Sequence, residues 1–90
     1  MVYKIEWRQD ALKELGKLDN SVRIQINKFI KKLASRDNPR IIGEALKDNL
    51  SAYWRYRVGD YRIIAEIQDD KFVILVVGID HRKQVYKKDR

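Results

Sequence analysis

The sequence predicts an α+β fold in which a helical hairpin packs on a mainly antiparallel four-stranded sheet. Three segments alternate polar and apolar residues, a fourth is apolar throughout, and two segments near the N-terminus repeat apolar residues every three or four positions. Along the chain these segments follow the order βααβββ, so we expect the helices to cover one face of the sheet. Because 90 residues suffice for one domain and not for two, residues 1–90 are expected to form a single domain.

The N-terminal half begins with an alternating segment, residues 2–7, which predicts a half-buried strand. Residues 9–18 then show helical spacing, although Gly16 is expected to weaken the last turn. Asp19 or Asn20 is expected to cap the second helix. The two apolar stripes are formed by Ala11, Leu12, Leu15 and Leu18 and by Val22, Ile26, Phe29, Ile30 and Leu33. Two such helices joined by so short a turn predict an antiparallel hairpin with one apolar side.

The second half begins with residues 35–51, which show no sustained period and are predicted to form a loop with one helical turn around Glu44 to Leu46. Residues 52–58 and 61–68 alternate and are separated by a Gly-Asp turn, which predicts a hairpin. Residues 72–79 have no polar face. This last segment is therefore expected to be a central strand covered on both sides.

Composition excludes several classes of protein and favours a polyanionic partner. The chain has no cysteine and one histidine, which argues against a disulfide scaffold, a cysteine nucleophile and a histidine-based metal cluster. Its longest apolar run is far shorter than the roughly 20 residues that span a bilayer, so we expect a cytoplasmic protein with no membrane segment, metal or cofactor. With 20 Lys and Arg against 13 Asp and Glu, the net charge of +7 favours nucleic acid first and an acidic protein second. Residues 81–90 form a basic C-terminal segment.

No familiar catalytic motif can be assembled, and the remaining candidates are cations and hydroxyls of the last three strands. Arg55 and Arg57 are two residues apart and share one strand face, and Arg62 follows the next turn. Three further residues follow the last strand: His81, Arg82 and Tyr86. We expect all six to converge on the side of the sheet that the helices leave open. Alternating arginines on an edge strand also prevent edge-to-edge aggregation, which requires no ligand.

Two segments make the chain recognisable. Residues 54–63, WRYRVGDYRI, followed by residues 79–86, IDHRKQVY, resemble the RelE branch of the RelE/ParE toxin superfamily. The resemblance implies a fold like that of microbial ribonucleases and a toxin of a type II toxin–antitoxin system. It implies an endoribonuclease that enters the ribosomal A site and cleaves mRNA there, leaving a 2′,3′-cyclic phosphate and a free 5′-OH. The implied partners are a RelB-like cognate antitoxin, the ribosome with its mRNA, and operator DNA bound through the antitoxin complex.

The resemblance also assigns residues to the site. Arg55 and Arg57 match two basic strand residues, Arg62 matches the arginine after the hairpin, and Tyr86 matches the C-terminal tyrosine. A further basic position after the last strand is matched by either His81 or Arg82. Additional RNA contacts are expected from Lys47, Lys83, Lys87 and Lys88. Some members carry lysine where this chain has arginine. Because arginine stays charged, these arginines are expected only to stabilise phosphate charge, which leaves proton transfer to Tyr86 and His81.

Two other functions remain open from the sequence. A ParE-like toxin would inhibit DNA gyrase by protein binding, and it would have no evident use for the arginines and the tyrosine. A non-catalytic module would bind an antitoxin and, with it, operator DNA through the basic helix face around Lys28, Lys31 and Lys32.

Overall fold

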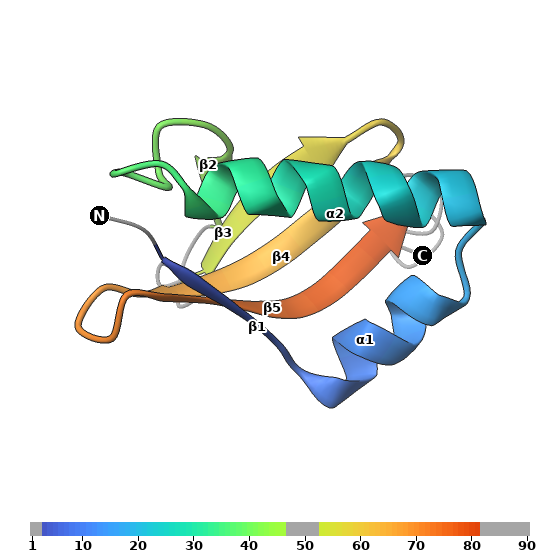
Figure 1. The fold of residues 1–90 in the computed structure, drawn as a ribbon, viewed down its shortest axis with the longest axis horizontal. Coiled ribbons are helices and arrows are strands. Elements are labelled where there is room, and N and C mark those ends of the chain that lie inside the picture. The colour runs from blue at the N-terminus through green and yellow to red at the C-terminus, as the bar shows by residue number, and fades with distance from the viewer. Residues whose placement is uncertain (1–2, 47–52, 82–90) are drawn as a thin grey trace.

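A computed structural model of the chain describes residues 3–46 and 53–81, and its five strands form one sheet with both helices on the same face (Figure 1). The elements are β1 (Lys4–Trp7), α1 (Gln9–Gly16), α2 (Asn20–Ala34), β2 (Glu44–Ala45), β3 (Tyr53–Val58), β4 (Tyr61–Gln68) and β5 (Val73–His81). Across the sheet the strand order is β1-β5-β4-β3-β2, and only the pairing of β1 with β5 is parallel. The α+β prediction is confirmed, with five strands in place of four.

The additional strand is β2, in the segment where the sequence predicts a loop. Glu44 and Ala45 pair with Arg55 and Trp54 of β3. The pairing continues where the amide of Leu46 donates to the carbonyl of Tyr53 at 3.2 Å. A strand of two residues is too short to show an alternating pattern, so it gives no period-2 signal. The predicted helical turn at residues 44–46 is therefore wrong.

The two helices run in opposite directions, and α2 lies lengthwise across the sheet (Figure 1). Ile26, Ile30 and Leu33 of α2 are buried against the strands, as their spacing predicts. The shorter α1 packs on β5 and ends at Gly16, where the loss of helix propensity was expected to weaken it. Leu12 differs from the prediction because its side chain is 51% exposed. Neither helix of the described ranges is long and apolar enough to span a membrane.

The apolar strand β5 lies inside the sheet between β1 and β4, which confirms its central position. Ile74 and Val76 are buried beneath the helices, whereas Leu75 is only half-buried. Within residues 3–46 and 53–81, helices cover only one side of this strand, so the cover expected on its second side stays a prediction. The sheet therefore has one helix-covered face and one face that the described elements leave open.

Candidate functional site

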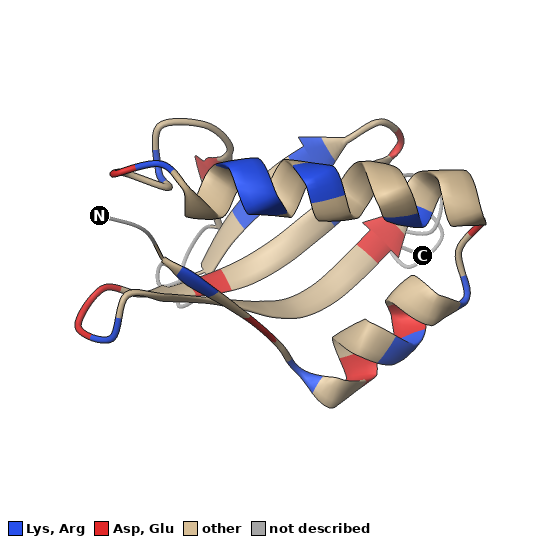
Figure 2. Cartoon of the chain, in the orientation of Figure 1, with Lys and Arg blue, Asp and Glu red and all other residues tan. Residues whose placement is uncertain are grey.

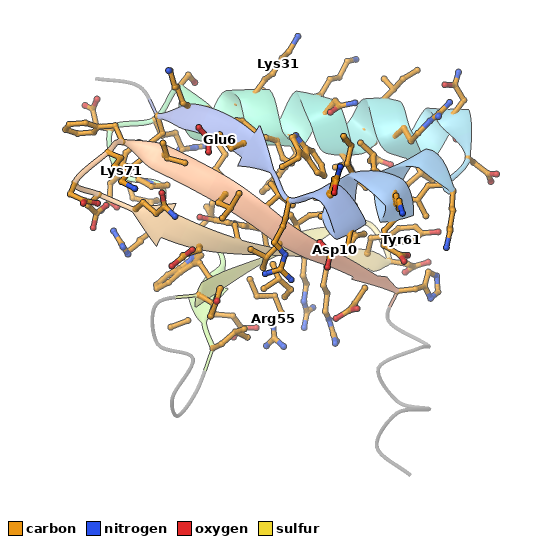
Figure 3. All side chains as sticks on the ribbon, turned by 90° about the horizontal axis from the view of Figure 1, so that it is seen from below. Glu6, Asp10, Lys31, Arg55, Tyr61 and Lys71 are labelled. Atoms are coloured by element: carbon orange, nitrogen blue, oxygen red, sulfur yellow. The ribbon has the colours of Figure 1, made fainter. Side chains whose placement is uncertain are left out.

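Three arginines gather on the open face because of the alternation in β3 and its pairing with β4. Tyr56 and Val58 of β3 are buried on the helix side, so Arg55 and Arg57 project from the other side. Arg57 lies directly opposite Arg62 of β4, which places both on the same face. Figure 3 shows Arg55 on the side of the sheet opposite to α2. We call Arg55, Arg57 and Arg62 the arginine cluster.

A carboxylate from β2 joins the arginine cluster. Glu44 pairs with Arg55 across the strands, and Arg55 Nη2 donates to Glu44 Oε2 at 2.7 Å. This hydrogen bond and the charge of Arg55 lower the pKa of the Glu44 carboxyl, with smaller contributions from the charges of Arg57 and Arg62. The positive potential of all three arginines therefore reaches one carboxylate, which is ionised at neutral pH. Arg55 Nε is buried and has no hydrogen-bond partner among the described residues, so one donor of the cluster is unused.

The loop before β2 fixes the position of Glu44. Gly43 has a φ of +83°, and a Cβ there would come within 2.5 Å of the Arg55 carbonyl oxygen. Only glycine permits both this conformation and this close approach. Two side chains of β3 form hydrogen bonds with this loop. Trp54 Nε1 donates to the carbonyl of Ile42 and Tyr56 Oη donates to the carbonyl of Pro39, each at 2.7 Å. The position of Glu44 thus depends on contacts made by the buried side of β3.

A hollow of about 280 Å³ lies beside the arginine cluster at the β2–β3 edge. Its lining consists of Phe29, Ile42, Gly43, Glu44, Arg55, Tyr56 and Arg57. Apolar and aromatic groups form one part of this lining, and the charged groups of β2 and β3 form the other. Such a surface suits a ligand that combines an anionic group with a flat apolar group.

His81 does not join the arginine cluster. It lies opposite Tyr61 at the end of β5, and the two rings meet edge to face with centroids 4.8 Å apart. Because the side chain of Tyr61 is on the helix side, His81 faces that side as well. The cause is a register shift between β4 and β5, in which Ile64 and Ala65 pair with Gly78 and Val76 and leave one residue of β5 unpaired. Because of this extra residue, the last residues of β5 face the opposite sides of the sheet from those that unbroken alternation predicts.

The expectation that all six candidates converge on the open face is therefore wrong for His81. Asp80 takes the corresponding place on the open face, opposite Arg62. A glycine inside an apolar strand often marks a bulge, so Gly78 was the available signal. Arg82 and Tyr86 lie outside the described residues and stay predictions, as do the RNA-contacting residues Lys47, Lys83, Lys87 and Lys88.

Glu44 is the member of the site that sequence reasoning missed. It lies in a segment without periodicity, 11 residues before its partner Arg55. The signal that could have found it is Gly43, since a glycine before a polar residue in a loop can mark a close backbone approach. Within residues 3–46 and 53–81, no group of three His, Asp or Glu side chains is placed to hold a metal ion.

The arrangement can bind a phosphate group and accept a proton. Arginine offers planar pairs of donors that match phosphate oxygens, and it remains protonated at any usable pH. The arginine cluster can therefore stabilise negative charge but cannot transfer protons. Glu44, which is ionised, can accept a proton from a hydroxyl group held near the phosphate.

Comparisons with known proteins agree on one family. The family model described as the ParE toxin of type II toxin–antitoxin systems, parDE, matches residues 5–86. The mRNA interferase toxin RelE of Escherichia coli strain K12 is 31% identical over 85 residues, which are 93% of this chain and 87% of that protein.

Solved structures share the fold. The toxin–antitoxin complex RelBE2 from Mycobacterium tuberculosis has a TM-score of 0.81 at 24% identity, covering 91% of this chain and 93% of the other. The intact Escherichia coli RelBE toxin–antitoxin complex has a TM-score of 0.71 at 28% identity, covering 88% and 95%. The arrangement of helices and strands described above is therefore also that of the toxin chains in these complexes.

Proposed function

Since the chain belongs to the ParE toxin family of type II toxin–antitoxin systems, we propose that it is the member of a toxin–antitoxin pair that cleaves mRNA in the ribosomal A site. The relative named RelE, 31% identical over 85 residues, confirms the resemblance of the chain to the RelE branch. The observation that carries the cleavage proposal is the arginine cluster around Glu44, with Arg55 and Glu44 in contact at 2.7 Å. Phosphoryl chemistry uses such a cluster directly, whereas inhibition of another protein by binding does not require it.

In the proposed reaction the 2′-OH of one nucleotide attacks the adjacent phosphorus. The bond from O2′ to phosphorus forms, the bond from phosphorus to O5′ breaks, and the products are a 2′,3′-cyclic phosphate and a free 5′-OH. The arginine cluster stabilises the charge that develops on the phosphoryl oxygens. Glu44 accepts the proton of the 2′-OH, and Tyr86, assigned by the resemblance, gives a proton to O5′.

The same electrostatics give a physical reason for the proposed dependence on the ribosome. The pKa of Glu44 is lowered by Arg55, and a carboxylate with a lowered pKa is a weak base. An arriving phosphate competes with Glu44 for Arg55, which frees the carboxylate but does not orient the RNA. Correct in-line orientation contributes roughly 7–11 kcal/mol to lowering a barrier. We propose that the ribosome supplies it by holding the codon in a strained, extended form.

The test compares the purified chain on free mRNA with the same mRNA in initiated ribosomes, and maps both the cut sites and the end groups. We expect cuts in the A-site codon with 2′,3′-cyclic ends and almost none in free mRNA. Arg57→Gln and Glu44→Gln are expected to lose cleavage, while Lys71→Gln, an exposed residue in the β4–β5 turn, retains it. Equal cleavage of both substrates would contradict the proposal. Inhibition of gyrase supercoiling without RNA cuts would favour the ParE-like alternative.

A cognate antitoxin is the proposed protein partner. The solved relatives named above are complexes of RelE-type toxins with their antitoxins, and an acidic segment complements a cationic face. Expression of the chain alone is expected to stop growth, and co-expression of the adjacent gene is expected to restore it. The resulting complex is expected to bind operator DNA. Harmless expression of the folded chain without a partner would contradict this part of the proposal.

A further inference from the structure

A second carboxylate lies beside the arginine cluster, and no step of the proposed reaction uses it. Asp80 of β5 lies directly opposite Arg62 of β4, and Arg62 lies opposite Arg57 of β3. These three residues therefore form one row across the open face, with the Cβ atoms of neighbours about 5 Å apart. Asp80 is the only acidic residue of β5, and Figure 2 shows red at the end of this strand and blue near the end of β3.

The unpaired residue of β5 brings Asp80 to this face. Val76 is buried on the helix side, so unbroken alternation would place Asp80 on the helix side as well. The register shift between β4 and β5 places it beside Arg62 instead. Glu44 lies beside Arg55 at the β2 side of the cluster. The arginine cluster therefore has one carboxylate at each side.

The two carboxylates differ in their contacts. Glu44 is hydrogen-bonded to Arg55 at 2.7 Å, whereas Asp80 forms no ion pair with a Lys or Arg of residues 3–46 and 53–81. The charges of Arg57 and Arg62 also help to lower the pKa of Glu44, so charges on this face act on one another across several strands. The charge of Asp80 therefore acts on any anion that binds at the same arginines.

Three arginines alone favour the phosphate group with the most negative charge, because the Coulomb energy is proportional to the charge of the ligand. A phosphate inside an RNA chain is a diester with one negative charge. A monoester, as in a free nucleotide or at a phosphorylated RNA end, has a second pKa of about 6 and carries nearly two charges at about pH 8. A site that acts on the diester therefore needs a group that reduces the advantage of the monoester.

We propose that Asp80 is a specificity-determining residue, whose carboxylate lowers the preference of the arginine cluster for phosphate monoesters and so favours the internal phosphodiester of an RNA chain. Its repulsion is twice as large for a ligand with two charges as for one with a single charge. It acts from one to two strand spacings away, about 5–10 Å, which is close to the Debye length of about 8 Å in physiological salt. RNA as the natural ligand rests on the proposed function, whereas the selection by charge is a property of the site itself.

A purely structural role for Asp80 predicts a different result. Opposite charges that face each other across two strands stabilise a sheet, so Asp80 could serve only to hold Arg62 in place. Loss of that contact would lower the melting temperature and would weaken the binding of both kinds of phosphate by the same factor. Selection by charge instead predicts tighter binding of both, by unequal factors.

The test measures the affinity of the full chain for two deoxynucleotide ligands at about pH 8, by NMR titration. The dinucleotide d(ApA) supplies a phosphodiester, and deoxyadenosine 3′-monophosphate supplies a monoester. Neither ligand has a 2′-OH next to its phosphate, so neither can be cleaved. Asp80→Asn is expected to bind the diester about threefold and the monoester about tenfold more tightly than the wild type does, because the removed repulsion counts twice for the monoester.

Two variants control for shape and for net charge. Asp80→Glu keeps the negative charge and is expected to retain the wild-type ratio of the two affinities. Glu66→Gln removes one charge from the same face of β4, four residues from Arg62, and is expected to change this ratio much less than Asp80→Asn does. Equal factors for the two ligands, weaker binding of both, or the same change of ratio in Glu66→Gln would overturn the proposal. Thermal melts of each variant confirm that it is folded.

A competition assay extends the test to the proposed reaction. Deoxyadenosine 3′-monophosphate is expected to inhibit mRNA cleavage on ribosomes by Asp80→Asn at about one-tenth of the concentration that inhibits the wild type. Loss of cleavage in Asp80→Asn with unchanged affinity for both ligands would overturn the proposal and assign Asp80 to proton transfer. If the wild type does not cleave mRNA, the proposed function fails, while the ratio of the two affinities still decides the role of Asp80.

Discussion

Tyr56 and Arg57 are neighbours in β3, yet they belong to different parts of the molecule. Tyr56 is 1% exposed beneath α2, and its hydroxyl donates to the carbonyl of Pro39. Arg57 is exposed on the opposite face, across from Arg62. The same division holds along β4, where Ile63 and Ala65 are buried on the helix side. One set of strands therefore supports the core with alternate residues and presents the site with the others, so substitutions on the two faces should have separable effects.

The largest expected effect is on stability, from the helix-covered face. Tyr56→Ala should lower the free energy of unfolding by about 3–5 kcal/mol, because it removes a fully buried ring from the core. A small domain has only about 5–15 kcal/mol in total, so this variant should be close to unfolded at growth temperature. Urea denaturation of the full chain measures the change. Tyr56→Phe is the control and should cost about 1 kcal/mol, the net value of the lost hydrogen bond.

On the open face the expected effect is on cleavage instead. Arg57→Gln should reduce mRNA cleavage on ribosomes about 10²–10³-fold, the usual cost of one lost electrostatic contact to a transition state. The melting temperature should not fall, because Arg57 and Arg62 are like charges directly opposite each other. Initial rates and thermal melts are measured on the same preparation. A melting temperature several degrees lower would show that Arg57 has a structural role and would remove the distinction between the faces.

Gly43 packs against the buried side chains of β3 and directly precedes Glu44, so its substitution should affect both stability and cleavage. Gly43→Ala should cost about 1–3 kcal/mol, because it combines a strained positive φ with a clash against β3. It should also reduce cleavage by displacing Glu44. Gly59→Ala is a matched control, since Gly59 has a φ of +61° but open space where a Cβ would lie. Equal losses of stability would show that backbone strain alone matters at position 43.

The smallest expected effect concerns the ion pair between Arg40 and Asp69, which belongs neither to the buried core nor to the arginine cluster. Asp69 accepts hydrogen bonds from Arg40 Nη1 at 3.1 Å and from Tyr3 Oη at 2.8 Å, and these contacts lower the pKa of its carboxyl. A carboxyl whose pKa is lower in the folded chain stabilises the fold above its unfolded pKa. This contribution is lost as pH falls through the folded value, which lies below the usual pKa of about 3.9. Because both side chains are partly exposed, we expect only about 0.2–1 kcal/mol.

Denaturation at pH 7 and at pH 3 measures this contribution. Asp69→Asn should be less stable than the wild type at pH 7 and should show a smaller loss on acidification. The neighbouring exposed residue provides the control as Asp70→Asn. If both variants kept the wild-type dependence on pH, the Arg40–Asp69 contact would have no measurable value.

The sequence by itself determined the division of β3 and β4 between the two faces. Alternation in residues 53–58 and 61–68 assigns each side chain to a face, and the short turn at Gly59-Asp60 places Arg57 across from Arg62. These rules are local, because a strand has a period of two and a tight turn fixes the register of its hairpin. The resemblance of residues 54–63 and 79–86 similarly needed no coordinates to indicate the family.

Only the tertiary structure decided which other groups meet the arginine cluster. Glu44 reaches Arg55 through a two-residue strand whose position is fixed by Gly43 and by contacts from the buried side of β3. His81 leaves the open face because one unpaired residue in β5 reverses the alternation near the strand end. Both features arise from how one strand pairs with the next, β2 with β3 and β4 with β5, and not from the alternation within a single strand. The free energy of such pairing depends on packing and register across the whole sheet, which a local pattern of polar and apolar residues does not contain.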